Sequence, residues 1–184
     1  SIESIKNIIQ NNGSKYFAVL VEPFSASSLL ELSTEFMIEL RNLCKEYDIV
    51  LIYDEVYTGW GKTGSLMNFM RSSEKAEGYK DIVPDILTSA KTLGGGKASI
   101  SGYIASDKIF KKAYDNLKDA TLHSTTYYGF GEETVTALEA INIVVEEDHP
   151  AIAKNLGVKI NEKSKKLKEK YPNLISDIRG KGLL

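Results

Sequence analysis

The chain has 184 residues, 42% of them hydrophobic and 26% charged, and its formal net charge of −2 argues against nucleic acid or an anionic membrane surface as the main partner. No apolar run approaches the roughly 20 residues of a membrane span, and the first residues lack the pattern of a signal segment. Cys44 is the single cysteine, so an internal disulfide is excluded and a cytoplasmic, reducing setting is expected.

Helical and strand patterns alternate along the chain. Short continuous apolar runs such as FAVLVEP and IVLIYDEV indicate strands, and apolar residues that recur every three or four positions indicate helices. In chain order the predicted elements are helix 2–12, strand 17–23, helix 34–47, strand 49–56, strand 85–91, strand 101–106, a helix that begins after Ser106, helix 132–147 and helix 150–170. This order is typical of an α/β fold, with a mostly parallel sheet and helices on both of its faces.

Apolar stripes indicate the helix faces that we expect to be buried. Helix 34–47 carries Cys44 on this face, with Ser33 or Thr34 as its N-cap. The stripes of the later helices are Ile109, Phe110, Ala113 and Leu117, then Val135, Leu138, Ile141 and Val145, and finally Ile152, Leu156, Ile160, Leu167 and Tyr171. The polar stretch 71–81 is predicted to be an exposed loop insertion.

We expect the chain to be a piece of a longer protein. It begins with Ser1 rather than a methionine, and it stops after ISDIRGKGLL, which has the pattern of a strand that is just starting. A second structural unit is expected to begin near residue 150, at Pro150.

Three of the predicted strands end in ionisable side chains that can bind a ligand or take part in a reaction. Glu22 ends the first strand, Asp54 and Glu55 follow the second, and Lys91 ends the third. Ligands of open parallel sheets bind outside the carboxyl ends of the strands. A carboxylate at the end of a dry strand also costs several kcal/mol unless a partner compensates its charge. The sequence therefore predicts a ligand or a countercharge at this edge.

Three interpretations of Asp54 compete. A nucleotide hydrolase would need a phosphate loop, but the nearest match, GGGKAS at 94–99, has Lys91 in place of the first glycine and Ala98 in place of the hydroxyl residue. A purely structural role is the usual explanation for a lone acidic residue. The third interpretation joins Asp54 to Lys91, because a lysine in a dry pocket can form a Schiff base and a buried carboxylate favours a protonated pyridine nitrogen.

The segments VEP, LIYDEVYTGWGKTG, PDILTSAKTLGGG, HSTT and IRGKGLL follow one another in an order that resembles class III aminotransferases. These are pyridoxal-phosphate enzymes with the aspartate-aminotransferase fold (fold type I). The pair DEV-x-T-G and D-I-L-x-x-x-K-x-L-G-G-G makes the resemblance specific, and it covers nearly the whole chain. It implies a three-layer α/β/α large domain, with residues 1–149 as its C-terminal part and 150–184 as the start of a truncated small domain.

The resemblance also implies roles for five residues. Lys91 corresponds to the catalytic lysine that binds pyridoxal 5′-phosphate and moves a proton. Asp54 corresponds to the partner of the pyridine nitrogen, and Val56 to a residue that packs on the ring, although plain core packing explains Val56 equally well. Tyr57 stands where many members have a glutamine near the cofactor oxygen. Thr126 corresponds to a threonine that contacts the cofactor phosphate of the neighbouring subunit in a homodimer with shared active sites.

Other residues near these motifs receive more modest interpretations. Thr125 is the alternative to Thr126 if the alignment shifts by one position. Glu55 is expected to be structural, bonded to loop amides, and no metal site is expected. His123 is either near the site or a structural histidine, and His149 is expected on the surface.

The implied activity is amino-group transfer between an amine or amino acid and a keto acid or aldehyde. Departures from the family pattern, such as FSASSLL after Glu22-Pro23, leave the substrate open. An aminomutase, racemase or decarboxylase on the same fold would keep Asp54 and Lys91, and a non-catalytic scaffold is the alternative outside enzymes. The chain alone is expected to be inactive and to bind the cofactor weakly, because the resemblance places other site residues outside it.

Overall fold

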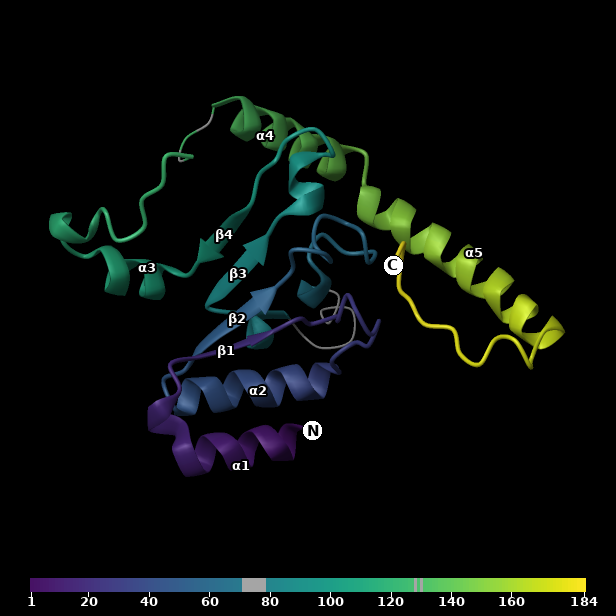
Figure 1. The fold of residues 1–184 in the computed structure, drawn as a ribbon, viewed down its shortest axis with the longest axis horizontal. Coiled ribbons are helices and arrows are strands. Elements are labelled where there is room, and N and C mark those ends of the chain that lie inside the picture. The colour runs from purple at the N-terminus through teal and green to yellow at the C-terminus, as the bar shows by residue number, and fades with distance from the viewer. Residues whose placement is uncertain (71–78, 128, 130) are drawn as a thin grey trace.

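The structure, a computed structural model, describes residues 1–70, 79–127, 129 and 131–184. At its centre lies a sheet with the order β1-β2-β3-β4, whose strands are Ala18–Val21, Val50–Asp54, Ile86–Ser89 and Gly102–Ala105 (Figure 1). Strands β1, β2 and β3 run parallel, and β4 pairs antiparallel with β3. The predicted α/β fold with a mostly parallel sheet is confirmed, and its reversed strand lies at the edge.

The predicted helices are all present in the described residues. Their bounds are Ile2–Asn12 for α1, Thr34–Glu46 for α2, Asp107–Tyr114 for α3, Gly131–Glu146 for α4 and His149–Lys170 for α5. Ser33 is the N-cap of α2, because its side chain accepts a hydrogen bond from the amide of Phe36. None of the described helices combines the length and the apolarity needed to cross a bilayer.

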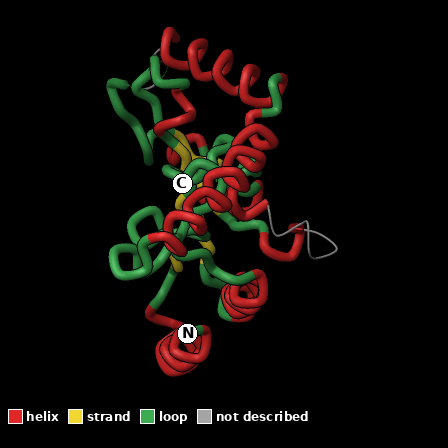
Figure 2. Tube along the Cα trace, turned by 90° about the vertical axis from the view of Figure 1, so that its right-hand side faces the viewer, coloured by secondary structure: helices red, strands yellow, loops and turns green. Residues whose placement is uncertain are grey.

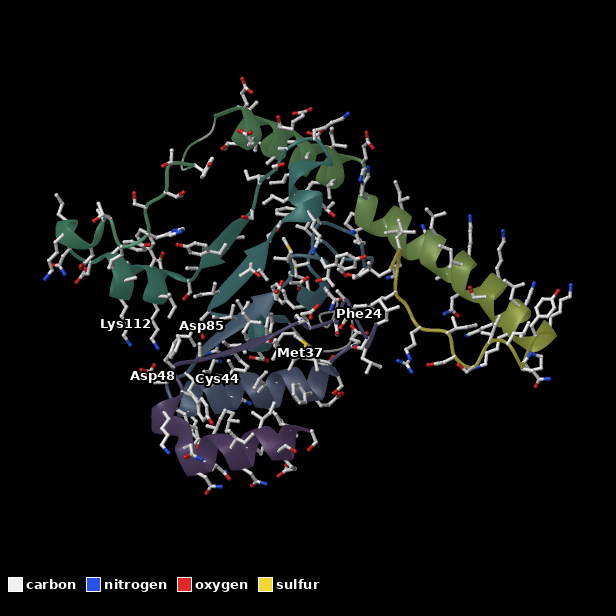
Figure 3. The ribbon with its side chains drawn as sticks, viewed as in Figure 1. Phe24, Met37, Cys44, Asp48, Asp85 and Lys112 are labelled. Atoms are coloured by element: carbon white, nitrogen blue, oxygen red, sulfur yellow. The ribbon has the colours of Figure 1, made fainter. Side chains whose placement is uncertain are left out.

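The hydrophobic core lies between α2 and one face of the sheet. Met37, Leu40 and Cys44 of α2 are buried there against Leu51 and Tyr53 of β2, and Figure 3 shows Met37 and Cys44 between the helix and the sheet. The prediction that Cys44 is buried is confirmed, and burial raises the pKa of its thiol to about 11. Helix α1 packs on α2, and Figure 2 shows the two helices end-on beside each other.

The apolar stripes of the later helices are not buried as predicted. Exposed members are Phe110 and Leu117, Val135, Leu138 and Val145, and Ile152, Leu156, Ile160, Leu167 and Tyr171. The buried positions are instead Ala137 and Val144 on α4 and Ala153 on α5. No other described element covers these apolar faces of α3, α4 and α5, so the side chains stay in contact with solvent although they are apolar enough to be buried.

The segment ISDIRGKGLL does not form a strand, which corrects the prediction. Gly180 and Gly182 have positive φ angles of 147° and 59°, which turn the backbone. The amide of Leu183 then donates to the carbonyl of Lys62 at 2.9 Å, so the segment is held by a loop rather than by a sheet. In the predicted insertion 71–81, residues 71–78 lie outside the described residues, and the division into two domains near residue 150 stays a prediction.

Candidate functional site

Asp54 and Lys91 lie at the same edge of the sheet. Asp54 is the last residue of β2 and pairs in register with Thr88 of β3, and Lys91 begins the 3-10 turn Lys91–Gly94 directly after β3. Because β2 and β3 are adjacent and parallel, their carboxyl ends coincide. The structure therefore brings the two residues to neighbouring strand ends, where open α/β sheets bind ligands (Figure 1).

The carboxylate of Asp54 is half-buried and only partly satisfied. Its Oδ1 accepts hydrogen bonds from the amide of Val56 at 2.9 Å and from the hydroxyl of Thr88 at 3.3 Å. Among the described residues, no donor reaches Oδ2. Asp54 is therefore held in one orientation by its own loop and the next strand, and its second oxygen remains available to an N–H donor.

Glu55 is fully buried and has a structural role, as its alternation along the chain predicts. Its carboxylate accepts from the hydroxyl of Thr58 at 2.7 Å and from the amides of Asn68 and Phe69 at 2.8 Å each. Burial raises the pKa of Glu55 above its ordinary value, although these three hydrogen bonds oppose the shift. Glu55 stands at the start of the loop that follows β2, and its hydrogen bonds to Asn68 and Phe69 hold the far end of that loop against the start.

Glycines allow this loop to fold back tightly. Gly61 and Gly64 have φ angles of 91° and 97°, and the amide of Gly61 donates to the carbonyl of Leu66. The indole nitrogen of Trp60 donates to the hydroxyl of Ser89 at 2.5 Å. The bond from Trp60 to Ser89 holds the loop against β3, and the bond from Gly61 to Leu66 closes the loop on itself.

Two ammonium groups lie over the ring of Tyr57. The Nζ of Lys91 is 4.8 Å from the ring centroid and the Nζ of Lys62 is 4.6 Å from it. Lys91 has a φ of 50°, which is the left-handed region that a non-glycine residue rarely adopts. Such backbone strain is concentrated at functional sites in proteins. Sequence reasoning missed Lys62, and its only signal was its position in GKTG beside the predicted site.

The remaining predicted residues lie apart from this pair. Thr126 is exposed in the segment between α3 and α4, and no hydrogen bond joins it to Asp54 or Lys91. Thr125 accepts from the amide of Tyr127 at 3.3 Å. His123 contacts the ring of Tyr103, with the two centroids 6.2 Å apart. His123 therefore links this segment to β4 at Tyr103, the residue that pairs with Thr88 of β3.

Two alternative chemistries find little support in the geometry. Glu22 at the end of β1 accepts from the amide of Ala26 at 2.8 Å, which explains it as a loop cap. The glycines of 94–96 form turns, and no helix follows them as a phosphate loop requires. Within the described residues, no group of three histidine, cysteine or carboxylate side chains is placed to hold a metal ion.

Comparison with known proteins gives a consistent result. The profile described as aminotransferase class-III matches residues 1–184. An acetylornithine aminotransferase from Elizabethkingia anophelis has a TM-score of 0.84 at 29% identity, and the match covers 100% of this chain and 43% of that chain. An ornithine aminotransferase from Plasmodium yoelii has a TM-score of 0.81 at 27% identity, covering 100% and 45%. A pyridoxal-phosphate-bound amine transaminase from an uncultivated Pseudomonas species has a TM-score of 0.85 at 26% identity, covering 98% and 40%.

The chain spans less than half the length of these structures, and the match runs through both sequence motifs and the whole described fold. Asp54 and Lys91, at adjacent strand ends, both lie within the matched region. The chain belongs to the class-III aminotransferase family.

Proposed function

We propose that the protein transfers an amino group between an amine or amino acid and a keto acid or aldehyde, with pyridoxal phosphate as its cofactor. The observation that carries the proposal is the placement of Asp54 and Lys91 at adjacent strand ends, with Asp54 Oδ2 open to a donor among the described residues. Family membership and the names of the similar structures support the same activity.

The residues present fit this cofactor. Asp54 offers a fixed anionic acceptor, which suits the protonated nitrogen of a pyridine ring. Lys91 offers a primary amine that makes no ion pair with a described carboxylate and lies over the ring of Tyr57. The Asp54 carboxylate and the Lys91 amine follow neighbouring strands, so one small aromatic molecule can contact both of them.

Each residue then has a defined task. Pyridoxal phosphate, when bound, supplies an aldehyde that condenses with amines and a ring that accepts electrons. Asp54 keeps a proton on the ring nitrogen, because its negative charge favours the protonated form. Lys91 provides the amine that would hold the cofactor, and its Nζ would take the proton from the substrate Cα and pass it to the cofactor carbon that carried the aldehyde. Val56 and Tyr57 position the ring, Val56 by packing and Tyr57 through its phenol.

Assembly and location are also proposals. We place Thr126 at the cofactor phosphate of a neighbouring subunit, because its exposure leaves it free to face a second copy of the chain. A homodimer with shared active sites follows from this placement. A cytoplasmic setting suits Cys44, which is a free thiol. Residues 1–149 and 150–184 would belong to the large and the small domain.

The test uses the visible absorption of the full-length protein with added pyridoxal phosphate. We expect the wild type to become yellow and to be bleached irreversibly by borohydride, and Lys91→Ala to lose the reducible absorption. Lys97→Ala is the matched control, because Lys97 is exposed six residues further along the same loop. A colourless wild type would refute the proposal. Exchange of the amino group with an added keto acid would separate transfer from isomerisation or decarboxylation.

A further inference from the structure

Lys62 lies beside the proposed reaction centre but has no part in the roles described above. Its Nζ is over the same ring of Tyr57 as the Nζ of Lys91, at 4.6 Å and 4.8 Å from the centroid. The two ammonium nitrogens can therefore be no further apart than the sum of these distances. Lys62 is thus within the reach of a small ligand that reacts at Lys91.

The charge of Lys62 is poorly compensated in the described chain. Its side chain is half-buried, and no described carboxylate lies within ion-pair distance of its Nζ. Burial and the positive charge of Lys91 both lower the pKa of Lys62 below its ordinary value. A bound anion would stabilise the charged form of Lys62, because it would compensate the lost hydration and offset the repulsion between the two ammonium groups.

The backbone at Lys62 is fixed on both sides. Its carbonyl accepts from the amide of Leu183 at 2.9 Å, and the amide of Gly64 donates to the carbonyl of Gly61 at 3.0 Å. A Cβ on Gly61 would come within 3.2 Å of Pro150, so the loop is packed against the start of α5. Because the main chain is held in this way and the ammonium group already lies over the Tyr57 ring, only the side chain has to be ordered further when an anion binds.

We propose that Lys62 is a substrate-binding residue that takes the carboxylate of an amino-acid substrate whose amino group reacts at Lys91. The inference rests on the proposed function and names its substrate class as amines that carry a carboxylate. The cofactor phosphate is the other anion that can lie near Lys62. The substrate is favoured because the Nζ of Lys62 lies over the same Tyr57 ring as the Nζ of Lys91, where the substrate amine reacts.

The experiment measures ligand affinity by calorimetry on the cofactor-loaded full-length protein. Pentanoate and pentanamide are the probes, since they have equal chain length, lack a reactive amine and differ in charge. We expect Lys62→Gln to weaken pentanoate binding about tenfold, which corresponds to about 1.4 kcal/mol. Lys62→Arg should retain most of the affinity, and Lys159→Gln, on an exposed lysine of α5, should bind as the wild type does. Affinity for pentanamide should be equal in all four proteins.

Three results would overturn the inference. One is a Lys62→Gln protein that binds pentanoate as tightly as the wild type. Another is a wild type that does not prefer pentanoate to pentanamide. The third is a Lys62→Gln protein that loses affinity for pyridoxal phosphate but not for pentanoate, which would assign Lys62 to the phosphate. If the wild type forms no yellow, reducible species, the proposed function fails, and the inference falls with it.

Discussion

At the scale of single residues, two adjacent carboxylates follow β2 and differ in almost every physical respect. Glu55 is fully buried and accepts three hydrogen bonds from its own loop. Asp54 is half-buried and accepts two, both on one oxygen. A residue whose hydrogen-bonding capacity is used up by the protein stabilises the fold, whereas one with a free acceptor at a strand end is suited to a ligand.

The first prediction concerns Asp54→Asn. The amide can still accept from Val56 through its oxygen, but its NH₂ group would face the ring nitrogen and could not hold a proton there. We expect the rate of the half-reaction with an amino acid to fall about a hundredfold, the effect of removing one preorganised electrostatic group. Stopped-flow absorption measures the rate, and Asp115→Asn on an exposed aspartate is the control. An unchanged rate would remove Asp54 from the chemistry.

A second prediction concerns the pH dependence of stability through Glu55. Its folded pKa lies above its ordinary value of 4.5, mainly because of burial, so the folded state binds this proton more tightly than the unfolded state. Stability should therefore fall as the pH rises from about 4.5 through the folded pKa, by at most about 1.4 kcal/mol per pH unit. Urea unfolding of the wild type and of Glu55→Gln at several pH values isolates this effect. A difference that is constant with pH would contradict it.

The separation of Asp54 from Glu55 followed from the alternation of side chains along a strand, because neighbours point to opposite faces. Lys62 could not be found in this way. It lies in a loop without periodicity, and its approach to Tyr57 depends on the positive φ angles of Gly61 and Gly64. Single-sequence patterns specify which face a regular element buries, but they do not specify the path of a glycine-rich loop.

At the scale of elements, an ion pair joins α2 to the start of β3. Arg41 of α2 donates to Asp85 at 2.7 Å, and the same carboxylate oxygen accepts from the amide of Leu51 in β2 at 2.9 Å. The Arg41 side chain is 7% exposed and that of Asp85 18%. This carboxylate therefore connects a helix and two strands, and it fixes how α2 lies on the sheet that carries Asp54 and Lys91.

The third prediction tests this connection with Arg41→Met. Removal of one partner leaves the Asp85 carboxylate without its countercharge, and we expect a loss of about 3 kcal/mol in the free energy of unfolding. The double variant with Asp85→Asn should recover part of the loss, since no unpaired charge remains. Lys108→Ala is the control: it breaks an ion pair to Asp48 whose side chains are both about 70% exposed, and stability should not change measurably (Asp48 is labelled in Figure 3). The prediction would be refuted if Arg41→Met and Lys108→Ala lowered the free energy of unfolding by the same amount.

Element types were predictable from apolar runs and helical spacing, but the direction of β4 was not. An apolar strand such as Gly102–Ala105 has the same composition whether it runs parallel or antiparallel. The direction depends on the connection from β3, which passes through the Lys91–Gly94 turn and returns without a helix. An antiparallel partner can follow such a short connection, whereas a parallel one requires a crossover.

At the scale of the whole molecule, the sheet has one covered and one open face in the described chain. Leu20 and Tyr103 lie on the face opposite α2, with 59% and 49% of their surface exposed, and Asp54 is on this face as well. The sequence predicted helices on both faces because continuous apolar strands require burial on both. In the described residues, α1 and α2 cover one face of the sheet, and Leu20 and Tyr103 on the other face stay exposed.

The last prediction addresses shared active sites in the full-length protein. If Thr126 serves the cofactor phosphate of a neighbouring subunit, Thr126→Asp should block that site by placing a carboxylate against the phosphate. Lys91→Ala blocks the site of its own subunit. Each variant alone should be inactive, but dimers formed from both contain one site with an intact Lys91 and an intact Thr126. Co-refolding the two in equal amounts should restore about a quarter of wild-type activity, given random pairing in a two-fold dimer. A mixture as inactive as its components would show that Thr126 serves its own subunit or none, whereas recovery would require the exposed segment between α3 and α4 to cross to the partner's strand ends.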